Sequence, residues 1–349
     1  MNVLAGEPSS SSAAAALAAL QQRTGLVIPV YLPPGVDQDL GARLLEDNVR
    51  CCLQQVGRPA SICLSADGQD CGWDRAQELA AAYGVQVCCV PQNMGKLQAV
   101  RLGAAQLLRD PELELLVVVD ADGDHFANEL LNFVRAARHA QQQGHAAEVL
   151  VLGRRMSRHR PMGFLRGELE ELADRVLLDA LAYDAAMHGR PLRLELATAV
   201  EEYPDFHSGY KLFTRAAAAA VFLAEPRLCG ATEDAYYRHG CEAVMTVEAL
   251  QAGAHLALVR RSTLNEQPVS SFGQLDRARL VADKMIWPCR RLQVPLPFAD
   301  QWLRNHLPRL LLTTLVPQGK EELVEIHRLV LDDLGAQPGK PVSWGPLFV

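Results

Sequence analysis

The 349-residue chain has no run of 18 apolar residues, no basic stripe and no Cys-x-x-Cys pair. Without such a run, no transmembrane helix is expected, which leaves only peripheral contact with a membrane. A formal net charge of −7 without a basic stripe argues against nucleic acid as the main partner. Because zinc-ligand spacing is missing, we interpret the nine cysteines as reduced, buried residues of a cytoplasmic protein.

The first residues also lack the positively charged segment of a signal peptide. Residues 1–22, with their serine and alanine runs, are predicted to be a flexible tail that contains at most a short helix over 13–22. Residues 23–267 are predicted to form one domain, followed by a helical C-terminal extension over 268–349.

Short apolar runs alternate with helical patterns through the first two-thirds of the chain. Strands are predicted at 26–31, 60–65, 85–90, 114–119 and 148–152, and helices at 39–56, 73–83, 96–108 and 128–142. Farther along we expect a helix at 167–188, strands at 208–213, 243–247 and 255–260, and helices at 272–292, 298–315 and 320–334. This alternation predicts an α/β fold with a mainly parallel sheet flanked by helices.

Three carboxylates follow the most apolar of these strands directly. Asp120, Asp122 and Asp124 stand at alternate positions after Val117-Val-Val119. Their mutual repulsion is costly unless a cation offsets it, and a Mg²⁺ or Mn²⁺ ion that bridges a diphosphate needs one or two carboxylates. The alternative is a solvated acidic turn that caps the next helix. We predict that Asp122 and Asp120 hold a metal, with Asp124 as an outer contributor.

Polar or turn residues also follow the other strands. Pro29-Val-Tyr31 ends the first strand and Ala66-Asp67-Gly68 the second, whereas the third is followed by Gln92-Asn93-Met-Gly-Lys96. Ligand sites of open α/β sheets lie at the carboxyl ends of strands. Asp67 is expected to accept hydrogen bonds from a base or ribose, and Lys96 with its helix N-terminus suits an anion. Each of these loops taken alone could be an ordinary connection.

The order P-x-Y, A-D-G, N-x-G-K and D-A-D-G-D-H resembles that of family 2 glycosyltransferases, which have the GT-A (Rossmann-like) fold. It is especially similar to the polyprenyl- and dolichyl-phosphate hexosyltransferase branch, and the resemblance spans residues 26–267. It implies metal-dependent transfer of a hexose from a nucleoside-diphosphate sugar to a hydroxyl or phosphate acceptor, with inversion. The donor-binding residues that the resemblance implies are Pro29, Tyr31, Asp67, Asn93, Lys96, Asp120, Ala121, Asp122, Arg155 and Gly209.

Two late segments fit the same resemblance. Gly153-Arg-Arg155 stands where the family has a G-x-R that faces phosphate, and Asp205 to Arg215 is similar to the family's D-x-x-x-G-x-K-L-F-x-R stretch. Thr232-Glu233-Asp234 matches the T-E-D that supplies the general base in inverting members. Asp234 is therefore the expected base, with Glu233 beside it. Glu248 of Thr246-Val-Glu248 is the alternative, and a helix cap is the structural alternative for Asp234.

The acceptor stays open between a small soluble molecule and a lipid phosphate. The apolar segment 302–316 could lie on the inner face of a membrane, pack on the core or form a homodimer contact. A sugar-nucleotide nucleotidyltransferase and a non-catalytic nucleotide-sugar-binding protein are the alternative functions. The loop Leu32-Pro-Pro-Gly35 argues against the first, because such enzymes carry a glycine-rich basic loop there, and its lack of an acidic residue supports the second.

Overall fold

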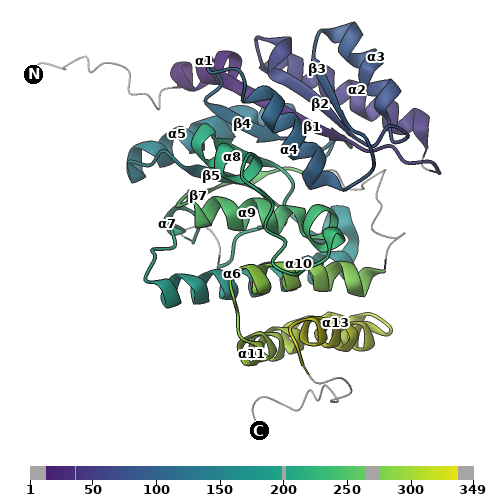
Figure 1. The fold of residues 1–349 in the computed structure, drawn as a ribbon, viewed down its shortest axis with the longest axis vertical. Coiled ribbons are helices and arrows are strands. Elements are labelled where there is room, and N and C mark those ends of the chain that lie inside the picture. The colour runs from purple at the N-terminus through teal and green to yellow at the C-terminus, as the bar shows by residue number, and fades with distance from the viewer. Residues whose placement is uncertain (1–12, 36, 199–201, 264–275, 337–349) are drawn as a thin grey trace, which may run out of the picture.

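The computed structural model describes residues 13–35, 37–198, 202–263 and 276–336 (Figure 1). The strands are β1 Thr24–Val30, β2 Ile62–Asp67, β3 Gln86–Val90, β4 Leu115–Val118, β5 Val149–Arg155, β6 Lys211–Thr214 and β7 His255–Arg261. The helices of the first half are α1 Ala13–Arg23, α2 Gln38–Gln55, α3 Trp73–Tyr83, α4 Lys96–Leu107, α5 Leu130–Gly144 and α6 His159–His188, which is kinked at Gly163. They are followed by α7 Glu195–Thr198, α8 Arg215–Phe222, a π-helix Asp234–His239, α9 Cys241–Gln251, α10 Arg277–Arg291, α11 Leu296–His306, α12 Leu312–Leu315 and α13 Gly319–Asp333. Short 3₁₀ turns lie at Pro59–Ser61, Ala127–Glu129 and Leu307–Arg309.

The seven strands form one sheet in the order β3-β2-β1-β4-β6-β5-β7. Its pairs are parallel except those of β6, which runs antiparallel to both β4 and β5. The carboxyl ends of the six parallel strands therefore share one edge with the start of β6. The prediction of a mainly parallel sheet flanked by helices is confirmed.

The apolar strands are buried on both faces. In β4, Leu116 and Val118 pack into the core that also contains α4, α6, α8 and α9, whereas Leu115 and Val117 pack into the core beneath α1, α2 and α5. Successive side chains of a strand point to opposite faces, so an uninterrupted apolar run is what a sheet covered on both sides requires. Each such buried side chain stabilises the fold by roughly 1.5–3 kcal/mol relative to exposure.

The chain before β1 belongs to this folded unit. Residues 13–23 form α1, whose Ala16 and Leu20 are fully buried and which packs on α5. This corrects the flexible-tail prediction for residues 13–22, while residues 1–12 lie outside the described part. The physical reason is that Ala16, Ala19 and Leu20 lie at helical spacing and form a small buried apolar face.

The C-terminal helices form a layer beneath α6 and α10, far from β2 and β3 in Figure 1. Their apolar residues continue the core of the sheet, since Leu303, Leu323 and Val330 belong to the same buried cluster as Leu116. The helix predicted over 298–315 is interrupted, because Pro308 lies in a 3₁₀ turn between α11 and α12. Of the helix predicted at 272–292, residues 272–275 lie outside the described part.

The strand predicted at 243–247 is wrong. These residues lie inside α9, where Ala243, Val244, Met245 and Val247 are all buried. A short apolar run buried on every side has no periodicity that distinguishes a strand from a helix. None of the helices in the described ranges is long and apolar enough to cross a membrane.

Candidate active site

The predicted donor residues converge on the carboxyl edge of the sheet. Asp67 ends β2, Lys96 opens α4 after β3, and Asp120 follows β4. Gly209 reaches the same edge from the other direction, because Lys211 of the antiparallel strand β6 pairs with Val118 at the end of β4. Residues that are up to 142 positions apart in the sequence thus meet at one place.

Asp67 shapes the loop between β3 and α4. Its Oδ1 accepts hydrogen bonds from the backbone N–H groups of Met94 (2.9 Å) and Gly95 (3.1 Å), and Oδ2 accepts from Gly95 (3.0 Å). Gly95 has φ 118°, and a Cβ there would lie 2.5 Å from the carbonyl oxygen of Tyr237. Asp67 is 4% exposed and committed to backbone amides. The prediction that it binds a base or ribose gives way to a role in holding the loop that carries Lys96.

Lys96 lies between two carboxylates. Its Nζ is 2.6 Å from Asp120 Oδ1 and 2.9 Å from Glu242 Oε1. Burial opposes the charged form of Lys96, but Asp120 and Glu242 outweigh it and raise the pKa of Lys96 well above its ordinary value. Burial likewise raises the pKa of Glu242, yet Lys96 and Lys211 lower it more, to about 2. All three groups are therefore charged at neutral pH.

Sequence reasoning missed Glu242. The residue stands at the start of α9, whereas the segment directly after it was predicted to be a strand. A signal was present in Gly240-Cys241-Glu242, an acidic residue directly before a buried apolar run. Glu248, the alternative late acid, points elsewhere, because its carboxylate accepts two hydrogen bonds from Arg291 of α10 at 2.7 and 3.0 Å.

Asp122, like Asp120, is half-buried. Its Oδ1 accepts the backbone N–H of Asp124 at 3.1 Å. Burial and, after it, the charge of Asp120 raise the pKa of Asp122 to about 6. A carboxylate held near another one in this way suits a divalent cation, whose charge relieves the repulsion. The residues fit an ion held by Asp122 and completed by ligand oxygens, and no group of three or more His, Cys, Asp or Glu side chains in the described ranges is arranged to hold one alone.

Asp124 has a different partner. It is 4% exposed, and its Oδ2 accepts two hydrogen bonds from the Arg261 guanidinium of β7, both at 3.2 Å. Arg261 also donates to the carbonyl oxygens of Asp124 and Gly153. Asp124 therefore ties the loop after β4 to β7, which corrects the prediction of an outer metal contributor.

Hydrogen bonds of its backbone groups also hold the loop after β4 in place. The backbone N–H of Asp120 donates to His125 Nδ1 at 2.8 Å, and Asn48 donates to the Asp120 carbonyl oxygen at 2.6 Å. The His125 ring stacks on Tyr210 with 4.5 Å between centroids. Burial lowers the pKa of His125 well below its ordinary value, so the ring is neutral and its proton lies on Nε2, 3.6 Å from Asp120 Oδ2.

Gly209 lies against the Asp120 carboxylate, since a Cβ there would come within 2.5 Å of Oδ2. Arg155 instead is buried, and its guanidinium donates to Asp205 and Glu170, with Nε 2.8 Å from Asp205 Oδ2. Burial disfavours its charge, but Asp205 and Glu170 raise the pKa of Arg155 well above its usual range. The prediction that Arg155 faces phosphate is corrected, because both of its acids would have to be released first.

Asp234 begins the π-helix and is 63% exposed, and its Oδ1 is 2.7 Å from Arg238 Nε. The same guanidinium donates to the Asn93 carbonyl oxygen at 2.6 Å, which places Asp234 beside the loop that carries Lys96. Glu233 is exposed next to it. A solvent-accessible carboxylate at the rim can accept a proton from a bound hydroxyl.

The other predicted donor residues differ in exposure. Pro29 is buried inside β1, Ala121 is half-buried and Tyr31 is 41% exposed at the edge. Buried polar atoms without a hydrogen-bond partner in the described structure include Asn93 Oδ1 and Ser208 Oγ, both in loops of this edge. Such atoms are rare in folded proteins and are expected where a ligand completes a site.

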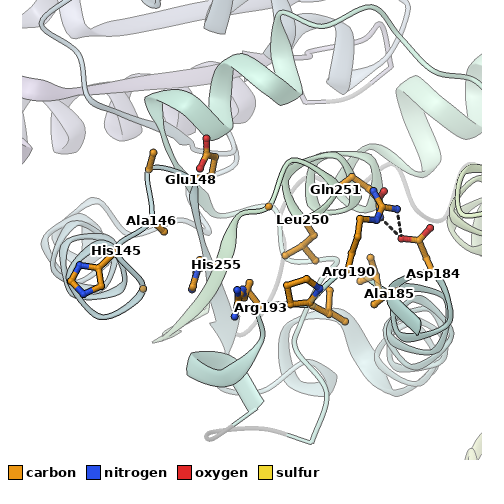
Figure 2. A pocket seen from close by; sticks show the side chains of 16 residues that line it. His145, Ala146, Glu148, Asp184, Ala185, Arg190, Arg193, Leu250, Gln251 and His255 are labelled. Carbon is orange, nitrogen blue, oxygen red and sulfur yellow. Dashed lines mark hydrogen bonds and ion pairs between the residues drawn. The ribbon is translucent and has the colours of Figure 1, made fainter. Parts of the chain in front are cut away.

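A separate cavity of about 540 Å³ lies at the opposite edge of the sheet (Figure 2). Glu148 and His255, at the amino ends of β5 and β7, line it together with Arg190 and Asp184. Asp184 accepts hydrogen bonds from Arg190 (2.9 Å) and Gln251 (2.7 Å), so the protein neutralises this carboxylate itself. None of the predicted donor, metal or catalytic residues lines this cavity.

No known family model matches the chain, and no curated protein matches it. Among solved structures, the chain is similar to residues 1–349 of TarS from S. aureus, with a TM-score of 0.39 and 10% sequence identity. The similarity covers 88% of this chain and 90% of that one. At this identity and TM-score it assigns neither substrates nor residue roles.

Proposed function

We propose that this chain is a GT-A-type, metal-dependent glycosyltransferase that moves a hexose from a nucleoside-diphosphate sugar to a hydroxyl or phosphate acceptor, with inversion. The observation that carries the proposal is the carboxylate pair Asp120 and Asp122 at the end of β4, next to the half-buried ion pair of Lys96 with Glu242. A sheet edge with two carboxylates, one neutralised by a lysine and one not, suits a magnesium- or manganese-bound diphosphate.

In this proposal Asp122 binds the divalent ion, and Asp120 binds the donor while Lys96 and His125 fix its carboxylate. When bound, the metal ion stabilises the diphosphate leaving group. Lys96, which Asp120 and Glu242 share, holds the Asp120 carboxylate beside that diphosphate. No group of the protein needs to protonate the leaving group.

Asp234 acts on the acceptor. Its exposed carboxylate accepts the proton of the attacking hydroxyl, and Arg238, whose Nε lies 2.7 Å from Oδ1, orients it. Attack from the side opposite the diphosphate inverts the anomeric centre. The acceptor itself is a small soluble molecule or a lipid phosphate.

The test measures thermal unfolding with UDP or GDP, each with and without Mn²⁺. A ligand at one hundred times its Kd stabilises the native state by about 2.7 kcal/mol. With the usual unfolding entropy per residue, this amounts to a rise of roughly 4 °C in Tm. We expect that rise for one diphosphate in the presence of Mn²⁺, and its loss in Asp122→Asn.

Asp39→Asn serves as the matched control, because Asp39 is exposed at the start of α2. It should respond as the wild type does. Absence of any shift with either diphosphate, or an equal shift in Asp122→Asn, contradicts the proposal. Pyrophosphate release from a nucleoside triphosphate and a sugar phosphate would instead identify a nucleotidyltransferase.

A further inference from the structure

A lysine inside the sheet is not explained by the site as described so far. Lys211 lies on β6, an interior strand, paired with Val118 of β4 on one side and Leu152 of β5 on the other. Its side chain is fully buried. Lysine is almost never fully buried unless it is paired, because removing an ammonium group from water is costly.

The partners of this ammonium are carbonyl groups of its own chain. Nζ donates to the carbonyl oxygen of Phe206 at 2.8 Å and to that of Ser208. Both carbonyls belong to residues 205–209, which we call the 205–209 loop. Lys211 thus donates these hydrogen bonds to the segment that leads into its own strand.

The far end of the 205–209 loop lies on the candidate donor site. A Cβ at Gly209 would lie 2.5 Å from Asp120 Oδ2 and 3.1 Å from Lys96 Nζ. A displacement of this loop by a few tenths of an ångström therefore changes the space around both charged groups. The other end of the loop is anchored independently, since Asp205 binds Arg155 and His207 Nδ1 lies 2.7 Å from Asp174.

We propose that Lys211 is a positioning residue of the donor site: its ammonium holds the 205–209 loop so that Gly209 lies against the Asp120 carboxylate. This inference rests on the proposed function for the role of Asp120. Burial lowers the pKa of Lys211 to about 8, and Glu242 opposes that decrease. Lys211 is thus charged at neutral pH, and burial of this charge lowers the stability of the folded state, as expected of a group retained for function.

The test compares Lys211→Met with Lys211→Arg. Methionine nearly matches the length of the side chain and removes the buried ammonium, but the carbonyl oxygens of Phe206 and Ser208 lose this donor, so we expect a folded variant with a lower Tm. In Lys211→Met, the Kd for the diphosphate that stabilises the wild type, UDP or GDP with Mn²⁺, should rise about tenfold. Arginine restores the donors and should return the Kd to within about threefold of wild type.

The matched control is Lys284→Met. Lys284 is also a buried lysine, but its Nζ pairs with Glu170 at 3.1 Å rather than with the 205–209 loop. This variant should lower Tm and leave the diphosphate Kd within threefold of wild type. An equal rise of Kd in Lys284→Met and Lys211→Met would overturn the proposal, since general loosening would then explain both.

Two further measurements keep the outcomes distinct. Gly209→Ala displaces the loop without touching Lys211, so it must weaken diphosphate binding even if Lys211→Met fails to fold. Hydrogen exchange of the 205–209 amides should accelerate in Lys211→Met without any ligand. If no diphosphate binds the wild type, the proposed function fails, and the exchange result alone decides whether Lys211 holds the loop; unchanged exchange overturns the inference.

Discussion

Replacing Glu242 with glutamine removes one negative charge from the half-buried cluster of Lys96, Asp120 and Glu242 and leaves the shape of the side chain almost unchanged. Glu242 binds Lys96 at 2.9 Å, and its carboxyl pKa falls from an ordinary 4.5 to about 2. A carboxyl whose pKa is lower in the folded state stabilises the protein above its unfolded pKa. That stabilisation is lost as the pH falls toward the folded value.

The magnitude follows from the two pKa values. The interval between 4.5 and about 2 corresponds to about 3 kcal/mol of unfolding free energy at neutral pH. Proton linkage reduces this contribution only slightly at pH 5 and to about half at pH 3. Glu242→Gln should therefore be about 3 kcal/mol less stable than wild type at pH 7, with a difference that shrinks steadily below pH 4.

The assay is urea unfolding of both proteins at a series of pH values. Taking the difference between wild type and variant removes the contribution of every other carboxyl group. Glu112→Gln is the control, because Glu112 is exposed, and its difference should stay within about 0.5 kcal/mol at each pH. A difference for Glu242→Gln below 1 kcal/mol at pH 7, or one that does not change with pH, would refute the reasoning.

Three further substitutions test other parts of the structure. Asp234→Asn should reduce sugar transfer, measured as product formation, at least a hundredfold. Its unfolding free energy should change by less than about 1 kcal/mol, because the ion pair of Asp234 with Arg238 is exposed. A large loss of stability would indicate a structural residue instead. Asp205→Asn leaves the buried Arg155 with one acid and should destabilise the fold by about 3–5 kcal/mol in urea unfolding. Asp124→Asn should cost about 3 kcal/mol for the same reason, since it removes the only carboxylate of the described structure that pairs with Arg261, and an unchanged unfolding midpoint would contradict this structural role.

The sheet could be predicted because its signal is local. Each of the first five strands is a short apolar run bounded by turn residues, and the helices between them carry caps such as Asp37, whose side chain accepts the N–H of Leu40. Because parallel strands have their carboxyl ends at one edge of the sheet, the polar residues that follow these strands all lie at that edge. This is why the sequence predicts Asp120 and Lys96, 24 positions apart, at the same edge, where Lys96 Nζ lies 2.6 Å from Asp120 Oδ1.

The partners of the charged residues could not be predicted, because they depend on distant segments. Arg155 meets Asp205, and Asp124 meets Arg261, across 50 and 137 positions of sequence. A G-x-R or a D-x-D-x-D pattern specifies the charge but not what neutralises it. Glu242 was missed for a related reason, since its role follows from the helical geometry of α9, which the apolar run after it does not reveal.

These ion pairs distinguish the three carboxylates after β4 by whether the protein itself neutralises them. Asp120 is neutralised by Lys96, and Asp124 is neutralised by Arg261. No lysine, arginine or histidine of the described ranges forms an ion pair with Asp122, and the pKa of Asp122 is raised to about 6 by burial and by Asp120. The protein therefore compensates two of the three charges internally and leaves the third to a cation. The metal prediction narrows to Asp122, so Asp122→Asn should abolish the manganese dependence of diphosphate binding, whereas Asp124→Asn should affect stability alone.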